Sequence, residues 1–144
     1  MGRRLFVLAV VAATFAVAAP FAQAAAWGVS DTTDTPVGQA CPGITGCSLR
    51  EAVTSAEASP GADAILVSGG GTTYTLTNGQ LNVTQSLTVS RVGAGSATVS
   101  GNSSSRIFNV TSGNFILRFM TLSNGAVLGA GPSRGAAIQG GPPS

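Results

Sequence analysis

Apolar and polar residues alternate in short runs along most of the chain from residue 64 onward. This alternation predicts half-buried β-strands, and the glycine, serine and asparagine residues between the runs predict tight turns. We expect eight strands, over residues 65–67, 74–76, 81–83, 87–89, 97–99, 107–110, 115–117 and 120–122. This part of the chain should therefore be all-β.

The spacing of apolar residues favours one arrangement of these strands. Two interleaved series recur with nearly the same period: Val67, Val89 and Val110, and Leu76, Val99 and Leu122. Such a period, with three short strands in each repeat, is typical of a parallel β-helix, a solenoid in which inward side chains stack on their counterparts in the next coil. An antiparallel sandwich also has short strands and glycine-rich turns, but nothing in that fold imposes this period.

A short helix is predicted before the first strand, over residues 48–58. Ser48 and Glu51 have the spacing of a capping box, in which each side chain bonds to the backbone N–H of the other residue. Pro60 and Gly61 should end the helix. The apolar residues on one helical face are Leu49, Ala52, Val53 and Ala56. Because so short a helix is marginal alone, we expect this face to dock on the first coil and cover its open end, leaving Arg50 at the edge or outside.

The segment 1–24 has the pattern of a secretory signal peptide. Two arginines are followed by an uncharged apolar run over residues 5–19, which is short for a membrane span. Ala22 and Ala24 provide the small residues that a signal peptidase reads, so cleavage is predicted after Ala24, with Ala26 as the alternative site. We therefore expect an exported protein with no stable membrane span after cleavage.

Charge is sparse, and this restricts the possible partners. The sequence has no histidine or lysine, seven arginines and five acidic residues. Loss of the signal peptide would remove two arginines, so the pI near 8.9 mainly reflects a segment that is discarded. The remaining chain has no basic stripe with which to neutralise phosphates, which argues against a nucleic-acid partner.

The two cysteines, Cys41 and Cys47, flank a turn-rich loop. In an exported chain such a close pair most simply forms a disulfide. A metal or redox site is the alternative, but a metal would require more ligands than the sequence offers, and the spacing is not C-x-x-C. We predict a disulfide and no metal or cofactor.

The residues that a polysaccharide-degrading enzyme would need are missing. Such enzymes use surface carboxylates as acid and base or as calcium ligands, and no Asp or Glu follows Asp63. Asp31 and Asp34 lie in a threonine-rich segment that we interpret as a solvated loop rather than a calcium site. Trp27 and Tyr74 are candidates for stacking on a sugar. No catalytic residue is predicted, and the chain is not expected to be an enzyme.

The segment Cys47-Ser48-Leu49-Arg50-Glu51-Ala52, with residues 61–65 after it, resembles the N-terminal CSLREA domain of bacterial exported proteins. In that family a cysteine precedes the motif, as Cys41 does here, and a right-handed parallel β-helix follows. The resemblance spans residues 29–138 and implies an exported, surface-associated role without a particular reaction. This chain departs from the family at the end of the helix, where Glu57 replaces asparagine, and in having few coils, so a truncated β-helix is expected.

The sequence thus predicts three parts: a signal peptide (1–24), a cap region with the disulfide loop and capping helix (25–63), and the first coils of a right-handed parallel β-helix (64–144). The expected function is that of a non-catalytic structural or adhesive module, secreted or on the cell surface, which contacts a glycan or a surface protein. Two alternatives remain open: the N-terminal part of a polysaccharide-degrading β-helix enzyme whose active coils lie beyond residue 144, and a fragment without independent function.

Overall fold

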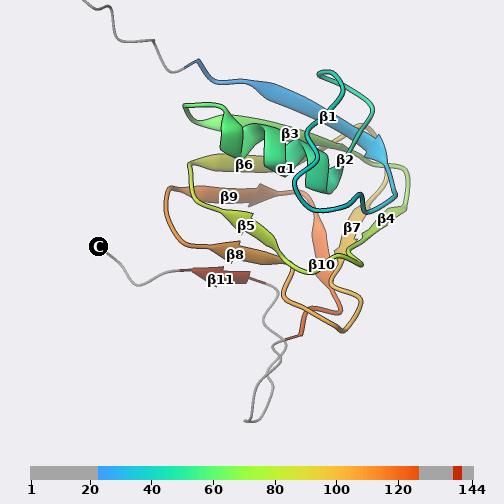
Figure 1. Ribbon diagram of the computed structural model, residues 1–144. Helices are drawn as coiled ribbons and strands as arrows, with labels where there is room; N and C mark the ends of the chain where they lie inside the picture. The colour runs from blue at the N-terminus through green and yellow to red at the C-terminus, as the bar shows by residue number, and fades with distance from the viewer. Residues whose placement is uncertain (1–22, 127–137, 141–144) are drawn as a thin grey trace, which may run out of the picture.

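The computed structural model describes residues 23–126 and 138–140, and in this part the chain forms mostly parallel strands around one helix (Figure 1). The predicted signal peptide lies almost entirely outside the described residues. The strands are β1 (Ala26–Asp31), β2 (Cys47–Ser48), β3 (Asp63–Ser68), β4 (Thr72–Thr75), β5 (Leu81–Val83), β6 (Leu87–Val92), β7 (Ala97–Ser100), β8 (Phe108–Val110), β9 (Phe115–Arg118), β10 (Thr121–Ser123) and β11 (Ile138–Gly140). Each of the eight predicted strands overlaps one of β3 to β10.

The strands form three parallel sheets with one shared core. The largest has the order β2-β1-β3-β6-β9, and the two smaller ones have the orders β10-β7-β4 and β11-β8-β5. Alternate side chains of β3 to β8 are buried in the core, as the apolar–polar pattern predicted. Phe108 of β8 and Phe115 of β9 lie side by side, with ring centroids 4.8 Å apart, and so join two of the sheets.

The predicted right-handed parallel β-helix is wrong: the described residues form three separate parallel sheets of unequal size and one short helix, not a solenoid of equal coils. The strand register contradicts the predicted series. Val67 pairs with Arg91 rather than with Val89, and Val110 belongs to a different sheet, where it pairs with Val83. In the second series, Val99 does pair with Leu122, but its partner on the other side is Tyr74 and not Leu76.

The physical reason is that the turns between strands differ in length. In the largest sheet, Ile65 pairs with Val89, and Val89 pairs in turn with Leu117. The stretch of chain from Val89 to Leu117 is longer than the stretch from Ile65 to Val89. Each extra turn residue shifts the register of the next strand. Apolar residues at equal spacing along the sequence therefore do not meet in space.

Two strands lie before residue 64, where the sequence predicted a turn-rich segment and the helix. Strand β1 pairs with β3, from Ala26 beside Ala64 to Val29 beside Val67, and β2 pairs with β1. Strands β1 and β2 continue the largest sheet past β3. Only Val29 of β1 is fully buried, so this strand has no apolar alternation from which it could have been predicted.

Helix α1 (Leu49–Ala58) agrees with the predicted helix. All four residues of its predicted apolar face are buried, and the helix packs against β1, β2, β3 and β5. Figure 1 shows α1 and β11 at opposite ends of the described part. None of the helical segments in the described ranges is both long enough and apolar enough to span a membrane.

Candidate functional site

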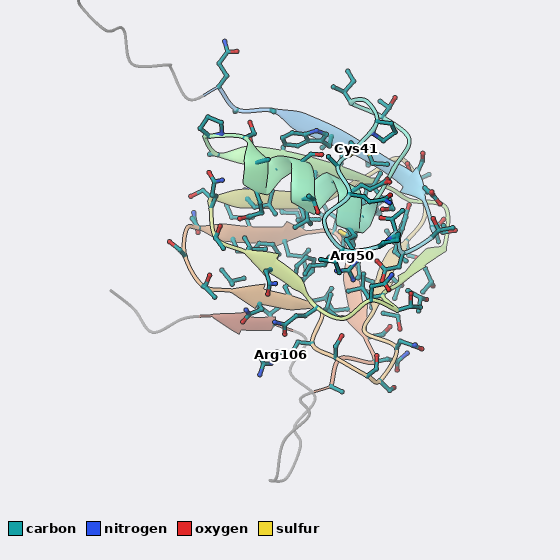
Figure 2. The ribbon with its side chains drawn as sticks, in the orientation of Figure 1. Cys41, Arg50 and Arg106 are labelled. Carbon is teal, nitrogen blue, oxygen red and sulfur yellow. A yellow bond between two sulfur atoms is a disulfide. The ribbon has the colours of Figure 1, made fainter. Side chains whose placement is uncertain are left out.

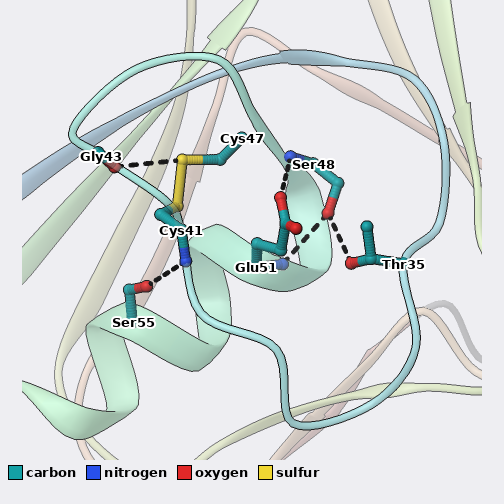
Figure 3. Close-up of a disulfide and its surroundings, with 7 residues drawn as sticks. All are labelled: Thr35, Cys41, Gly43, Cys47, Ser48, Glu51 and Ser55. Atoms are coloured by element: carbon teal, nitrogen blue, oxygen red, sulfur yellow. Dashed lines mark hydrogen bonds between the residues drawn. A yellow bond between two sulfur atoms is a disulfide. The ribbon is translucent and has the colours of Figure 1, made fainter.

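The disulfide fixes the loop that precedes α1. Cys41 and Cys47 are joined, with their Cα atoms 5.3 Å apart, which confirms the predicted disulfide (Figure 3). The Cys41 N–H donates to Ser55 Oγ of the helix at 2.8 Å, and Cys47 pairs with Val29 of β1. Figure 3 also marks a 3.5 Å contact from Cys47 Sγ to the Gly43 carbonyl oxygen, but a disulfide sulfur has no proton to donate. The loop is thus attached to the sheet at one end and to the helix at the other.

Ser48 and Glu51 form the capping box at the start of α1. Ser48 Oγ accepts from the Glu51 N–H at 3.2 Å, and the Ser48 N–H donates to Glu51 Oε2 at 2.9 Å. Thr35 Oγ1 lies 2.9 Å from Ser48 Oγ (Figure 3), so the same cap holds the segment before the disulfide. These contacts stabilise the start of the helix.

Arg50 is the buried centre of a polar cluster, although the sequence placed it at the edge of the helix or outside. Its Nε donates to Asp34 Oδ1 at 2.6 Å and its second terminal nitrogen donates to Asp34 Oδ2 at 3.1 Å, so the pair is bidentate. The Arg50 side chain is 5% exposed and that of Asp34 is 2% exposed. The guanidinium also donates to the carbonyls of Gly79 and Gln80. Figure 2 shows Arg50 on the side of Cys41, with Arg106 toward the other end of the molecule.

The interpretation of Asp34 as part of a solvated loop is also wrong. Its carboxylate accepts from the backbone N–H groups of Thr77 (2.6 Å) and Asn78 (2.7 Å) as well as from Arg50. Burial alone raises the pKa of this carboxyl group, but the hydrogen bonds from Arg50, Asn78 and Thr77 outweigh burial and lower the pKa below its ordinary value of 3.8. Within the described residues no three His, Cys, Asp or Glu side chains gather as metal ligands would.

The sheet β10-β7-β4 places three threonines side by side on one face. Thr73 pairs with Thr98, and Thr98 pairs with Thr121. Because the next residues along these strands face the core, the threonines face outward, and neighbouring strands are about 4.8 Å apart. Thr73 and Thr121 are exposed and Thr98 is half-buried. We call these three residues the threonine row, an uncharged line of hydroxyl groups on a rigid sheet.

A second polar row runs beside the first, two residues further along each strand. It consists of Thr75, Ser100 and Ser123. Ser100 is buried, and its Oγ accepts from the Asn102 N–H at 3.2 Å and lies 3.3 Å from Asn124 Nδ2. This row is therefore partly used inside the protein, and the threonine row is the more accessible of the two.

Phe119 lies two residues before Thr121 in the chain, in the segment that joins β9 to β10. The residue is 71% exposed, and its backbone has a φ of 59°, which is uncommon for a bulky residue. Arg91 Nε donates to the Phe119 carbonyl at 3.1 Å and so holds this conformation. Phe119 was not predicted as a site residue from the sequence. The available signal was a large aromatic residue in the gap between two predicted strands, where small turn residues are usual.

The aromatic residues that the sequence did suggest for sugar stacking lie elsewhere. Tyr74 is only 2% exposed, and its hydroxyl donates to the Ser68 carbonyl at 3.0 Å, so the suggestion is wrong for this residue. Burial raises the pKa of Tyr74 above its ordinary value of 10.0. Trp27 is partly buried and packs against the core.

Comparisons of this chain with protein-family models, with curated proteins and with solved structures found no match.

Proposed function

We propose that this protein is an exported, non-catalytic module that binds a neutral glycan through the threonine row and Phe119. The observation that carries the proposal is the line of outward hydroxyl groups at strand spacing, with the exposed Phe119 two residues before Thr121 in the chain. Membership of the CSLREA-domain proteins, inferred from residues 47–52, forms part of the same proposal.

The chemistry of the threonine row suits a sugar polymer. Threonine hydroxyls both donate and accept hydrogen bonds, as sugar hydroxyls do. The ring of Phe119 offers a flat apolar surface to the C–H face of a sugar. None of the three threonines carries a charge, so the row itself offers no ionic contact, and Arg91 is engaged with the Phe119 carbonyl. A polymer that contacts several positions gains affinity because each further contact forms within the complex.

Export is supported by two independent features. The Cys41–Cys47 disulfide is stable in oxidising compartments and rare in the cytosol. The pattern of residues 1–24 is typical of a secretory signal peptide. Expression of the full chain in a secreting bacterium, followed by fractionation and measurement of the N-terminal sequence, tests this half of the proposal.

Glycan binding is tested by retention on insoluble neutral polysaccharides of defined composition, such as cellulose and chitin. Thr98→Val removes one hydroxyl and keeps the β-branched shape, and Phe119→Ala removes the ring. Each should weaken binding about threefold to tenfold. Thr88→Val makes the same chemical change on β6 in the largest sheet and should leave binding unchanged.

Two outcomes contradict the proposal. In one, the wild-type protein is retained by none of the polysaccharides, or only by a surface protein. In the other, Thr88→Val weakens retention as much as Thr98→Val, which would place the binding surface elsewhere.

A further inference from the structure

Asp63, at the start of β3, is a buried carboxylate with one unused oxygen. The residue is 3% exposed. Its Oδ1 accepts from the Ala25 N–H at 2.8 Å, whereas Oδ2 is buried without a hydrogen-bond partner. The one ion pair in the described ranges joins Asp34 and Arg50, so no arginine there neutralises Asp63. A buried, unsatisfied carboxylate oxygen is costly, which indicates that a donor is missing.

The nitrogen that already bonds to Asp63 belongs to the residue after the predicted cleavage site. A peptide nitrogen at Ala25 has one proton and no charge. We propose that Asp63 receives the α-ammonium group that forms when the leader is removed between Ala24 and Ala25. This inference rests on the export proposed above, but it assigns a new role to Asp63: to bind the processed N-terminus and hold it in place.

The cleavage is an ordinary peptide hydrolysis, carried out by a signal peptidase. Water adds its OH to the Ala24 carbonyl carbon and one proton to the Ala25 nitrogen as the amide bond breaks. The new Ala24 carboxyl group then releases a proton, which completes the ammonium group of Ala25. That group has three protons and a positive charge, so it can bond to both Asp63 oxygens in the strong, charge-assisted form.

Strand pairing holds the new N-terminus beside the carboxylate. The Ala25 carbonyl accepts from the Ala64 N–H at 2.9 Å, and Ala26 begins β1 and pairs with Ala64. Ala24 is exposed, so its removal uncovers no core residue. A small groove that includes Asp63 is lined by apolar residues and by uncharged polar residues, and no basic side chain that would repel the ammonium group is part of its lining. Its polar members are Ser86, Thr88 and Asn114.

The sequence allows a direct test because it contains no lysine. In the processed chain the α-amine is the single primary amine, so an amine-reactive ester labels that group alone. Two chains are compared, one beginning at Ala25 and one beginning at Ala24, each released from a removable N-terminal fusion. Both begin with alanine, so their amines have the same intrinsic reactivity. We expect the Ala25 amine to react about tenfold more slowly in the folded protein.

Asp63→Asn should abolish this protection in the chain that begins at Ala25. In the chain that begins at Ala24, the same substitution should leave the labelling rate of the amine unchanged. The same substitution should also lower the equilibrium constant for folding, and this decrease should be about tenfold larger in the Ala25 chain than in the Ala24 chain. If Asp63→Asn does not fold, the two wild-type chains still decide the question. Equal labelling rates in these chains would show that Asp63 does not bind the amine and that its free oxygen is satisfied by water.

The natural cleavage site separates this inference from the proposed function. An exported protein that begins at Trp27 has lost Ala25, which overturns the inference and leaves export intact. A chain that is never exported overturns the proposed function and with it the natural role of Asp63. A chain that begins at Ala25 and shows a protected amine supports both.

Discussion

Replacement of Arg50 by methionine tests the polar cluster under α1 most directly. The substitution leaves the Asp34 carboxylate buried, with two backbone N–H donors but no opposite charge. It also removes the donor to the Gly79 carbonyl. Loss of one partner from a buried ion pair typically costs about 3 to 5 kcal/mol. We expect a loss of about 3 kcal/mol here, at the low end of that range, because the two backbone bonds to Asp34 remain.

The free energy of unfolding is measured in urea at neutral pH with the disulfide intact. Trp27 is the one tryptophan of the sequence and packs against the core, so its fluorescence reports the transition. Arg118→Met is the matched control, since Arg118 is exposed at the end of β9, and it should change stability by less than about 0.5 kcal/mol. Asp34→Asn and the double variant complete a double-mutant cycle.

The double-mutant cycle shows whether Arg50 and Asp34 stabilise the fold by interacting with each other or independently. Once Arg50 is gone, Asp34→Asn removes an uncompensated charge, so the double variant should lose much less than the sum of the single losses. A loss below about 1 kcal/mol for Arg50→Met would match an exposed pair and refute the reasoning. Simple additivity of the two substitutions would refute it as well.

Two pH titrations and one backbone substitution test other parts of the fold. Because the folded pKa of Asp34 lies below 3.8, the stabilisation from its ionised form is present above that pH and is lost as the pH falls further. When the free energy of unfolding is measured at decreasing pH, Asp34→Asn should therefore lose less of it than the parent protein does. The raised pKa of Tyr74 predicts stabilisation that is full below pH 10.0 and lost above it, and Tyr74→Phe should flatten this alkaline loss. Gly113 has a φ of 77°, and an added Cβ would lie 2.5 Å from the Gln85 carbonyl oxygen, so Gly113→Ala should cost more than about 1 kcal/mol in urea unfolding. If the free energy of unfolding changes equally steeply with pH in parent and variant, the prediction for that titration is wrong. If the urea midpoint of Gly113→Ala equals that of the parent, the prediction for Gly113 is wrong.

The features predicted correctly from sequence depend on residues that are close together in the chain. The capping box spans Ser48 to Glu51, and the helix then follows from apolar residues three and four positions apart. The strands β3 to β10 follow from alternation within each segment. The disulfide joins two cysteines only six positions apart. In each case the stabilising contact and the pattern that indicates it lie in the same few residues.

The features that were missed depend on distant parts of the chain. Arg50 binds Asp34, 16 positions earlier, and both reach the turn at Gly79. Nothing in the local sequence distinguishes this pair from two solvated charges. The threonine row exists only because Thr98 pairs with Thr73 and Thr121, and that register is set by turn lengths that apolar spacing cannot reveal.

The positions of the acidic residues connect the fold to the proposed function. Every carboxylate of the sequence accepts a backbone N–H: Asp31 from Thr33, Asp34 from Thr77, Glu51 from Ser48, Glu57 from Thr84 and Asp63 from Ala25. Each one therefore joins two segments or fixes a turn, and none lies on the threonine row. Acid–base attack on a glycan needs a carboxylate that faces the sugar and exchanges a proton with it. The acidic side chains thus serve the fold while the threonine hydroxyls face outward, an arrangement that supports the proposed binding of a sugar polymer.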